Sequence, residues 1–162
     1  MDLKAFKRRA KLKNKEITTF LKGLHKRKVK NLNSTVKKLH AETFTKIDCL
    51  DCANCCKTMV PTYRPSEIKR IAAHLNISPK AYFDKYLELD EDGDTKNRKT
   101  PCHFLGKDNK CSIYEIRPLD CRGFPHTDKS PVLHATSVNI ENIKHCPAVL
   151  NIFERLKEIV VK

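Results

Sequence analysis

The chain has 162 residues and a net charge of +14 at neutral pH, with 32% charged and 40% hydrophobic residues. That length is enough for a domain with its own hydrophobic core, so the eight cysteines are not needed merely to hold a very small fold together. No uncharged stretch is long enough to cross a bilayer, and charges interrupt the first residues where a signal peptide would be apolar. We therefore expect a cytoplasmic protein with no transmembrane segment, in which cysteines are interpreted as metal ligands or redox groups before structural disulfides.

The first 40 residues carry most of the net charge. They contain fourteen of the 33 Lys and Arg residues but only two of the 19 Asp and Glu residues, which is a local charge of +12. Apolar residues recur at spacings of three, four and seven on either side of Gly23, and this periodicity predicts two amphipathic helices whose apolar stripe packs against the body of the protein or a partner. The basic face is either a solvated helix surface or a binding surface for a polyanion, such as a nucleic acid or an anionic surface, at residues 1–40.

Four elements are predicted between the first and the later cysteines: helices over residues 65–75 and 79–87, and strands near residues 86–91 and 95–100. The second helix has Ser78 as a capping residue and Pro79 at its first position, where a missing N–H is tolerated. Asp92 and Gly93 supply a turn between the two strands, so the strands should form a hairpin.

The last third of the chain is predicted to contain a second hairpin over residues 102–114, a strand over 132–138 and a helix over 147–161 that begins at a proline. Together these elements predict an α+β fold, a small helix-rich single domain with short hairpins, cysteine-bearing loops and a basic helical N-terminus. We assign residues 1–44 to a basic amphipathic helical segment and residues 45–162 to a cysteine-cluster metal-binding domain.

The cysteines are the residues that carry the most information about function. Four fall within eight residues and four lie far along the chain: Cys49, Cys52, Cys55, Cys56, Cys102, Cys111, Cys121 and Cys146. The first three have the Cys-x-x-Cys-x-x-Cys spacing that wraps three corners of a cubane iron–sulfur cluster, and the fourth corner commonly comes from a remote cysteine followed by proline, as Cys146 is. We therefore favour a 4Fe–4S cluster, with zinc held by four thiolates as the alternative and disulfides or inert core thiols as a third interpretation.

Two arginines flank one of the later cysteines. Arg117 and Arg122 lie on either side of Cys121, where a guanidinium would partly neutralise thiolates or cluster sulfides and raise the reduction potential. An ion pair with a local carboxylate, such as that of Glu115 or Asp120, explains them equally well. No nucleophile–base pair, phosphate-binding loop or His-Glu-x-x-His motif is present, so we predict no catalytic residue and leave open whether the protein is an enzyme.

Three segments taken together resemble the YkgJ-type cysteine-cluster family, whose signature is CxxCxxCC. They are the cysteine run Cys49–Cys56, the segment Pro101–Leu105, and the segment Cys111–Pro125, which contains the pattern Arg-Pro-x-x-Cys-Arg-x-Phe-Pro. The resemblance spans about residues 45–150, with Cys146 as a less distinctive match to a downstream cysteine. It implies a bacterial, cytoplasmic protein that chelates zinc or iron, and it implies no particular reaction.

Three functions follow as hypotheses. The first is a metal or iron–sulfur protein whose cysteine thiolates hold the metal and thereby fix the fold. The second is an enzyme or enzyme subunit that uses a cluster for redox or methyl-transfer chemistry, because the related flagellin lysine N-methylases carry a similar cysteine cluster. The third is a nucleic-acid-binding protein that uses the basic segment and keeps the metal for structure alone.

Overall fold

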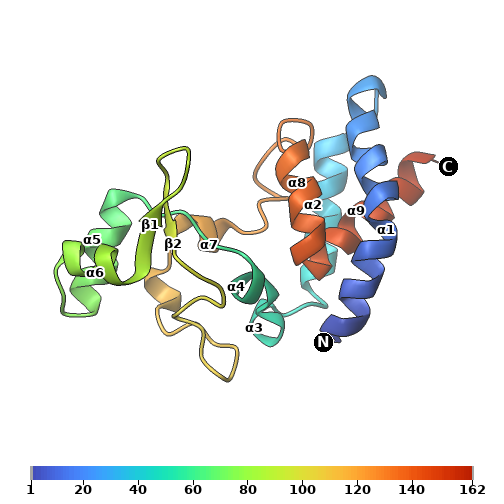
Figure 1. Ribbon diagram of the computed structural model, residues 1–162. Coiled ribbons are helices and arrows are strands. Elements are labelled where there is room, and N and C mark those ends of the chain that lie inside the picture. The colour runs from blue at the N-terminus through green and yellow to red at the C-terminus, as the bar shows by residue number, and fades with distance from the viewer. Residues whose placement is uncertain (1, 162) are drawn as a thin grey trace. The chain divides into compact units, whose positions relative to one another are not determined.

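The computed structural model describes residues 2–161, and it confirms a helix-rich α+β fold. Most described residues lie in helices, and the described part of the chain contains one two-stranded antiparallel sheet (Figure 1). The chain divides into two compact units. The helical unit runs up to Cys52 and resumes at Pro125, while the inserted unit is Ala53–Phe124. The expected boundary between residues 44 and 45 thus lies inside the helical unit.

The helical unit is built from four main helices that pack side by side (Figure 1). They are α1 (Leu3–Gly23), α2 (Leu32–Phe44), α8 (Thr136–His145) and α9 (Pro147–Val161), with the 3₁₀ helix η1 (Leu24–Lys26) and the one-turn α3 (Cys49–Cys52) between them. The apolar stripe of α1 is buried, including Phe6, Ile17 and Phe20. The prediction of two amphipathic helices separated near Gly23 is therefore confirmed, and the basic segment packs by one face on the helices from the end of the chain.

Local sequence explains where the long helices start. The side chain of Asp2 caps α1 by accepting from the backbone N–H groups of Lys4 and Ala5, both at 2.9 Å. Pro147 opens α9 as predicted. Ile152 and Phe153 of α9 have no exposed surface, and burying each such side chain contributes about 1.5–3 kcal/mol before entropy is counted.

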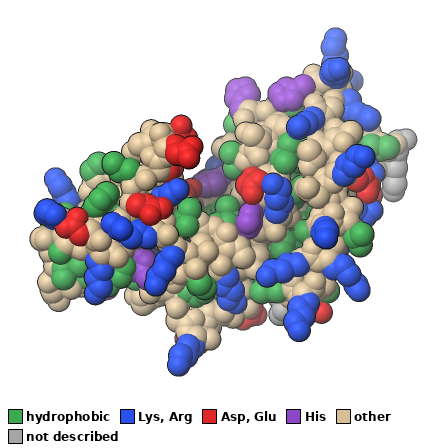
Figure 2. Space-filling view, viewed as in Figure 1, with side chains coloured by type: hydrophobic (Ala, Val, Ile, Leu, Met, Phe, Trp, Pro, Cys, Tyr) green, Lys and Arg blue, Asp and Glu red, His purple; other side chains and the backbone are tan. Residues whose placement is uncertain are grey.

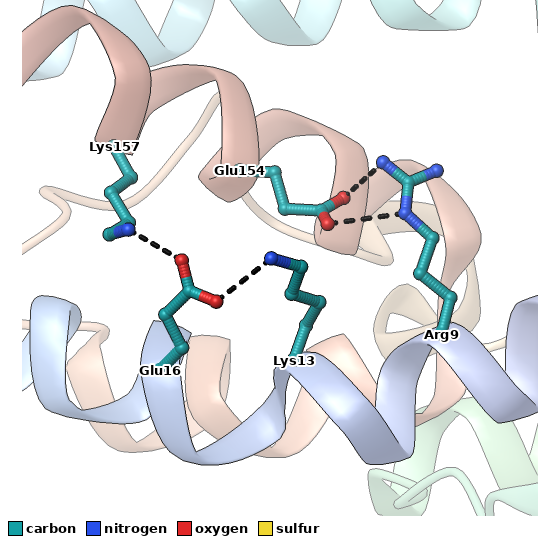
Figure 3. A network of polar contacts seen from close by, with 5 residues as sticks. All are labelled: Arg9, Lys13, Glu16, Glu154 and Lys157. Carbon is teal, nitrogen blue, oxygen red and sulfur yellow. Dashed lines mark hydrogen bonds and ion pairs between the residues drawn. The ribbon is translucent and has the colours of Figure 1, made fainter.

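Ion pairs join the exposed edges of α1 and α9 (Figure 3). Arg9 pairs with Glu154 at 2.5 Å, and Glu16 accepts from Lys157 at 2.5 Å and from Lys13 at 2.9 Å. These hydrogen bonds lower the pKa of Glu16 to about 2. Because Arg9, Lys13 and Glu16 are exposed, water and salt screen these pairs, and burial of the apolar stripes remains the main source of stability.

The inserted unit has shorter elements: α4 (Asn54–Thr58), α5 (Pro65–His74), α6 (Pro79–Tyr86), β1 (Leu87–Leu89), β2 (Thr95–Asn97), the 3₁₀ helix η2 (Tyr114–Ile116) and α7 (Leu119–Gly123). Its core is small and centres on Tyr82, which is fully buried among neighbours that include Ile71 and Phe104. Ser78 caps α6 by accepting from Ala81 at 3.1 Å, as predicted. The predicted hairpin is present with shorter strands.

Two other expected elements differ. The hairpin over residues 102–114 is reduced to a single bridge between Leu105 and Cys111. The strand over residues 132–138 was a wrong prediction, because this segment is a turn followed by the start of α8. The hydroxyl of Thr136 donates to the carbonyl of Leu133 at 2.8 Å, and the N–H of Val132 donates to Asn33 at 3.0 Å. These contacts outweigh the strand propensity of the valines.

The surface of the helical unit is rich in lysine and arginine. In Figure 2 the blue Lys and Arg side chains are scattered over its visible face, with fewer red carboxylates among them. None of the described helices combines the length and the low polarity that crossing a membrane requires.

Candidate metal centre

The cysteine run is divided between the two units. Cys49 and Cys52 are the first and last residues of α3 in the helical unit, whereas Cys55 and Cys56 lie in α4 of the inserted unit. Between the pairs, Ala53 adopts the left-handed conformation with φ 46° and ψ 21°, which costs a residue with a Cβ about 1–2 kcal/mol. The cysteine run therefore consists of two short helical turns separated by one left-handed residue.

The inserted unit contains five cysteines: Cys55, Cys56, Cys102, Cys111 and Cys121. The two sulfurs of the adjacent pair in α4 are 3.9 Å apart. The backbone N–H of Cys102 donates to the carbonyl of Cys56 at 2.8 Å, which joins the loop before residue 111 to α4. The bridge between Leu105 and Cys111 then closes the turn that separates the third and fourth of these cysteines.

Charge effects link four of these thiols. Burial raises the pKa of Cys121 far above its ordinary value, and negative charge on Cys56, Cys102 and Cys111 raises it further. Burial is also the main cause of the raised pKa of Cys102 and of Cys111, with the charge of Cys56 adding to both. Cys56 differs, because its contact with Cys55 lowers its pKa to about 7. Ionising one thiol thus opposes ionising the next, and a bound cation would remove that opposition.

A second, smaller group of thiols lies in the helical unit. Cys146 sits at the junction of α8 and α9 with 8% of its surface exposed. Its pKa is raised to about 12, mainly by burial and further by the charges of Cys49 and Cys52. Cys52 is buried and Cys49 is exposed. The eight cysteines therefore separate into a group in each unit.

Buried and half-buried carboxylates fix the helix that carries Cys121. Glu67 of α5 is 3% exposed and accepts from the N–H of Leu119, the first residue of α7, at 2.7 Å. The neighbouring Asp120 accepts from the N–H of Thr62 at 3.0 Å. A negative side chain at the start of a helix also interacts favourably with its unpaired N–H groups. These hydrogen bonds hold α7, and with it Cys121, in position within the inserted unit.

The two candidate arginines support the backbone around η2. Arg117 donates to the carbonyl of Tyr114 and covers that ring at 3.6 Å, while Arg122 donates to the carbonyl of Glu115 at 2.9 Å. The positive charge of Arg117 also lowers the pKa of Cys111, against the larger effect of burial. A role of Arg117 beside a metal-bound thiolate stays a prediction, and so does the corresponding role of Arg122.

Two further residues lie beside Cys102: Asn97, which the sequence did not single out, and His103, a possible ligand from its place next to a cysteine. Asn97 at the end of β2 donates from Nδ2 to Sγ of Cys102 at 3.5 Å. His103 stacks on Tyr86 with ring centroids 4.2 Å apart, and burial lowers its pKa to about 4, so it is neutral at pH 7. Its buried Nε2 has no hydrogen-bond partner among the described residues. The sequence signal was weak: a histidine next to a cysteine, and a polar residue at an inward strand position.

The side chains present fit a soft metal by their chemistry. No disulfide joins any of the described cysteines, and thiolate is the preferred ligand of zinc and of iron–sulfur clusters. Within residues 2–161, no three Cys, His, Asp or Glu side chains already stand in an arrangement that could hold a metal ion. The thiols thus influence one another's pKa, but their sulfur atoms do not converge on one metal position. Binding a metal there would require the cysteine side chains to rotate toward it.

Comparison with known proteins adds a family. A family model described as "CxxCxxCC: Putative zinc- or iron-chelating domain" matches residues 48–147. The chain is also 33% identical over 82 residues to "Uncharacterized protein MJ0661" of Methanocaldococcus jannaschii, a match that covers 49% of this chain and 44% of that relative. The aligned part is thus less than half of the relative's length. No solved structure matches the chain.

Proposed function

This chain belongs to the CxxCxxCC family, and from that premise we propose that it is a metal-binding protein whose main site is made by Cys56, Cys102, Cys111 and Cys121 of the inserted unit. The supporting observation is that the charge of Cys56 raises the pKa of the other three thiols, which lie on separate segments, and that the N–H of Cys102 donates to the carbonyl of Cys56 at 2.8 Å. A metal bound there would connect α4, the loops around residues 102 and 111, and α7. Its chemistry would be structural, since metal binding supplies free energy of folding.

The identity of the metal follows from the same group of thiols. Four thiolates from separate segments of one unit suit a closed tetrahedral zinc site, and they equally suit the four corners of an iron–sulfur cluster. The case for a 4Fe–4S cluster rested on Cys49, Cys52 and Cys55 acting together with Cys146. For the four thiols within the inserted unit, we propose zinc or an iron–sulfur cluster. We propose Cys49, Cys52 and Cys146 as a second thiol site.

Metal analysis tests the proposal. The full-length protein is purified without oxygen, and zinc, iron and acid-labile sulfide are measured per chain, together with visible absorption. Zinc without colour, or iron and sulfide with broad visible absorption, would support the proposal and would identify the metal. A colourless, metal-free protein that is folded with all thiols reduced would refute it.

Two matched serine substitutions assign the sites. Cys121→Ser removes a half-buried thiol of the four-thiol group, and Cys146→Ser removes the buried thiol of the smaller group. We expect Cys121→Ser to lose the main metal, and Cys146→Ser to keep it. Equal loss of that metal in both variants would contradict the assignment of separate sites.

A polyanion-binding surface is a second candidate, because part of the basic segment is unpaired. The charged side-chain groups of six residues of α1 have no hydrogen-bond or ion-pair partner among the described residues: Lys4, Lys7, Arg8, Lys11, Lys15 and Lys22. Arg27, Lys28 and Lys30 line a pocket of about 410 Å³ beside α9. We propose that this surface contacts phosphates.

Binding of a fluorescent RNA tests this second candidate. The binding should weaken steeply as salt rises, and it should be lost when Arg27, Lys28 and Lys30 are replaced by glutamine. Unchanged binding would exclude the proposed surface.

A further inference from the structure

Asn97 is a buried polar residue in contact with a proposed ligand. It is the last residue of β2, and only 1% of its surface is exposed. Its Nδ2 donates to Sγ of Cys102 at 3.5 Å, and its Oδ1 accepts from the hydroxyl of Tyr63 at 2.8 Å. A buried amide is costly unless its donor and acceptor atoms are both used, and here a sulfur uses one and a hydroxyl uses the other.

The backbone fixes both ends of the Asn97–Cys102 contact. Asn97 pairs with Leu87 in the register of the antiparallel sheet. Cys102 is held by its N–H, which donates to the carbonyl of Cys56 at 2.8 Å. The backbone positions of Asn97 and Cys102 are therefore each fixed by their own hydrogen bonds, and the contact between amide and sulfur does not depend on two mobile surface groups.

The direction of the amide suits a thiolate. A metal-bound or ionised sulfur accepts hydrogen bonds and has no proton to donate, so it needs an N–H facing it. Tyr63 is 6% exposed, and its hydroxyl donates to Oδ1, which leaves the NH₂ group of Asn97 turned toward the sulfur. If the amide were reversed, its oxygen would face the negative sulfur and repel it.

We infer that Asn97 is a positioning residue of the metal centre, which donates to the thiolate of Cys102 and is held in that orientation by Tyr63. The inference rests on the proposed function and deepens it. Hydrogen bonds to ligating sulfur localise charge, orient the ligand and tune the metal, and loss of such partners in metalloproteins typically weakens metal affinity by about 10–100-fold.

The test compares variants of the full chain, with Zn²⁺ and Co²⁺ as probes. Zinc affinity is measured by competition with a chromophoric chelator, and the thiolate-to-cobalt charge-transfer band reports the sulfur directly. We expect Asn97→Ala to weaken zinc binding by about 10–100-fold and to shift the band to lower energy, because the sulfur becomes more electron-rich. Asn97→Asp, which has the same size but lacks the donor and adds negative charge, should bind more weakly still.

A second buried asparagine provides the matched control. Asn142 in α8 is 2% exposed and donates from Nδ2 to the carbonyl of Pro125 at 3.2 Å, with no cysteine in that contact. Asn142→Ala should lose similar stability and keep both the zinc affinity and the cobalt spectrum. Tyr63→Phe, which retains Asn97 but frees its amide to turn, should weaken zinc binding by less than tenfold.

The outcomes separate this inference from the proposed function. Wild-type protein that binds neither Zn²⁺ nor Co²⁺ and contains no cluster would refute the function. Wild-type protein that binds, together with Asn97→Ala protein of equal affinity and unchanged charge-transfer band, would refute the role of Asn97 alone. If the native centre is an iron–sulfur cluster, the reduction potential should fall in Asn97→Ala and stay constant in Asn142→Ala.

Discussion

The helical unit has four helices of 10 to 21 residues, which bury apolar stripes against one another. Among its described residues, the inserted unit has only two α-helices longer than five residues, α5 and α6, with 10 and 8 residues. The inserted unit also places five thiols among loops and one-turn helices. Short helices are marginal without tertiary support. Apolar burial can therefore hold the helical unit, whereas the short elements and five thiols of the inserted unit agree with our proposal that a metal completes its fold.

The largest expected effect comes from removing the metal. We expect a strong chelator to abolish amide protection in the loops around residues 102 and 111 and in α7, and to leave α9 protected. A structural zinc contributes about 10–16 kcal/mol in small zinc domains at pH 7, far more than a single side chain. Hydrogen exchange before and after chelation measures this, and uniform loss of protection in both units would contradict the comparison.

Truncating a core side chain of the helical unit should destabilise that unit and leave the metal bound. Phe153 of α9 is fully buried in the helical unit. Phe153→Ala should lower the free energy of unfolding by about 3–5 kcal/mol, because the side chain leaves a cavity. Urea unfolding measures the loss, and metal content per folded chain should stay at the wild-type value. Release of the metal in folded Phe153→Ala would show that the units depend on each other more than proposed.

Removal of the Glu67 carboxylate should weaken only the inserted unit. Glu67→Ala leaves the N–H groups of Leu119 and Arg64 without their acceptor, at a cost of about 1–3 kcal/mol. The metal should also be lost more readily to a chelator, because α7 carries Cys121. Glu67→Gln retains one oxygen acceptor and is the control. Faster metal loss in the control than in Glu67→Ala would argue against the anchoring role.

The smallest effect is a pH dependence of the helical unit. His40 contacts Thr127 at 2.7 Å, and burial lowers its pKa below 6.5, with Asp128 partly opposing the shift. The unfolded chain therefore binds more protons than the folded one just below pH 6.5, and stability should fall as pH decreases through that window. Urea unfolding at pH 7.5 and 5.5 should show a smaller decrease in His40→Gln than in wild type. An equal decrease would exclude His40 as the cause.

Local signals predicted one end of each of three helices correctly. Gly23, Ser78 and Pro147 each lie where the sequence placed the end or start of a helix, because caps and prolines act through the neighbouring backbone. The segment 132–138 failed for the opposite reason. Its valines favour a strand, but contacts to Asn33, distant in sequence, and a local hydroxyl-to-carbonyl bond hold it as a turn leading into α8.

The sequence predicted the candidate ligands and one possible grouping of them. Spacing identified all eight cysteines as candidate ligands, and that assignment remains a proposal. Spacing also suggested that Cys49, Cys52 and Cys55 act together, and that grouping stays a prediction; the structure adds that Ala53, between Cys52 and Cys55, is in the left-handed conformation. An alanine gives no sign of such a conformation, since glycine and asparagine are the residues that usually adopt it. Nothing in the sequence indicated the role of Asn97 either, because Tyr63, which orients its amide, is 34 residues away.

Periodicity, capping residues and composition act locally, and they were enough to predict the helix-rich α+β class and the amphipathic packing of the basic segment. The tertiary structure was needed to find which thiols influence one another, where the cysteine run divides, and which polar side chain faces a sulfur. Those relations depend on the burial and mutual charge of segments far apart in the chain. No spacing between neighbouring residues encodes them.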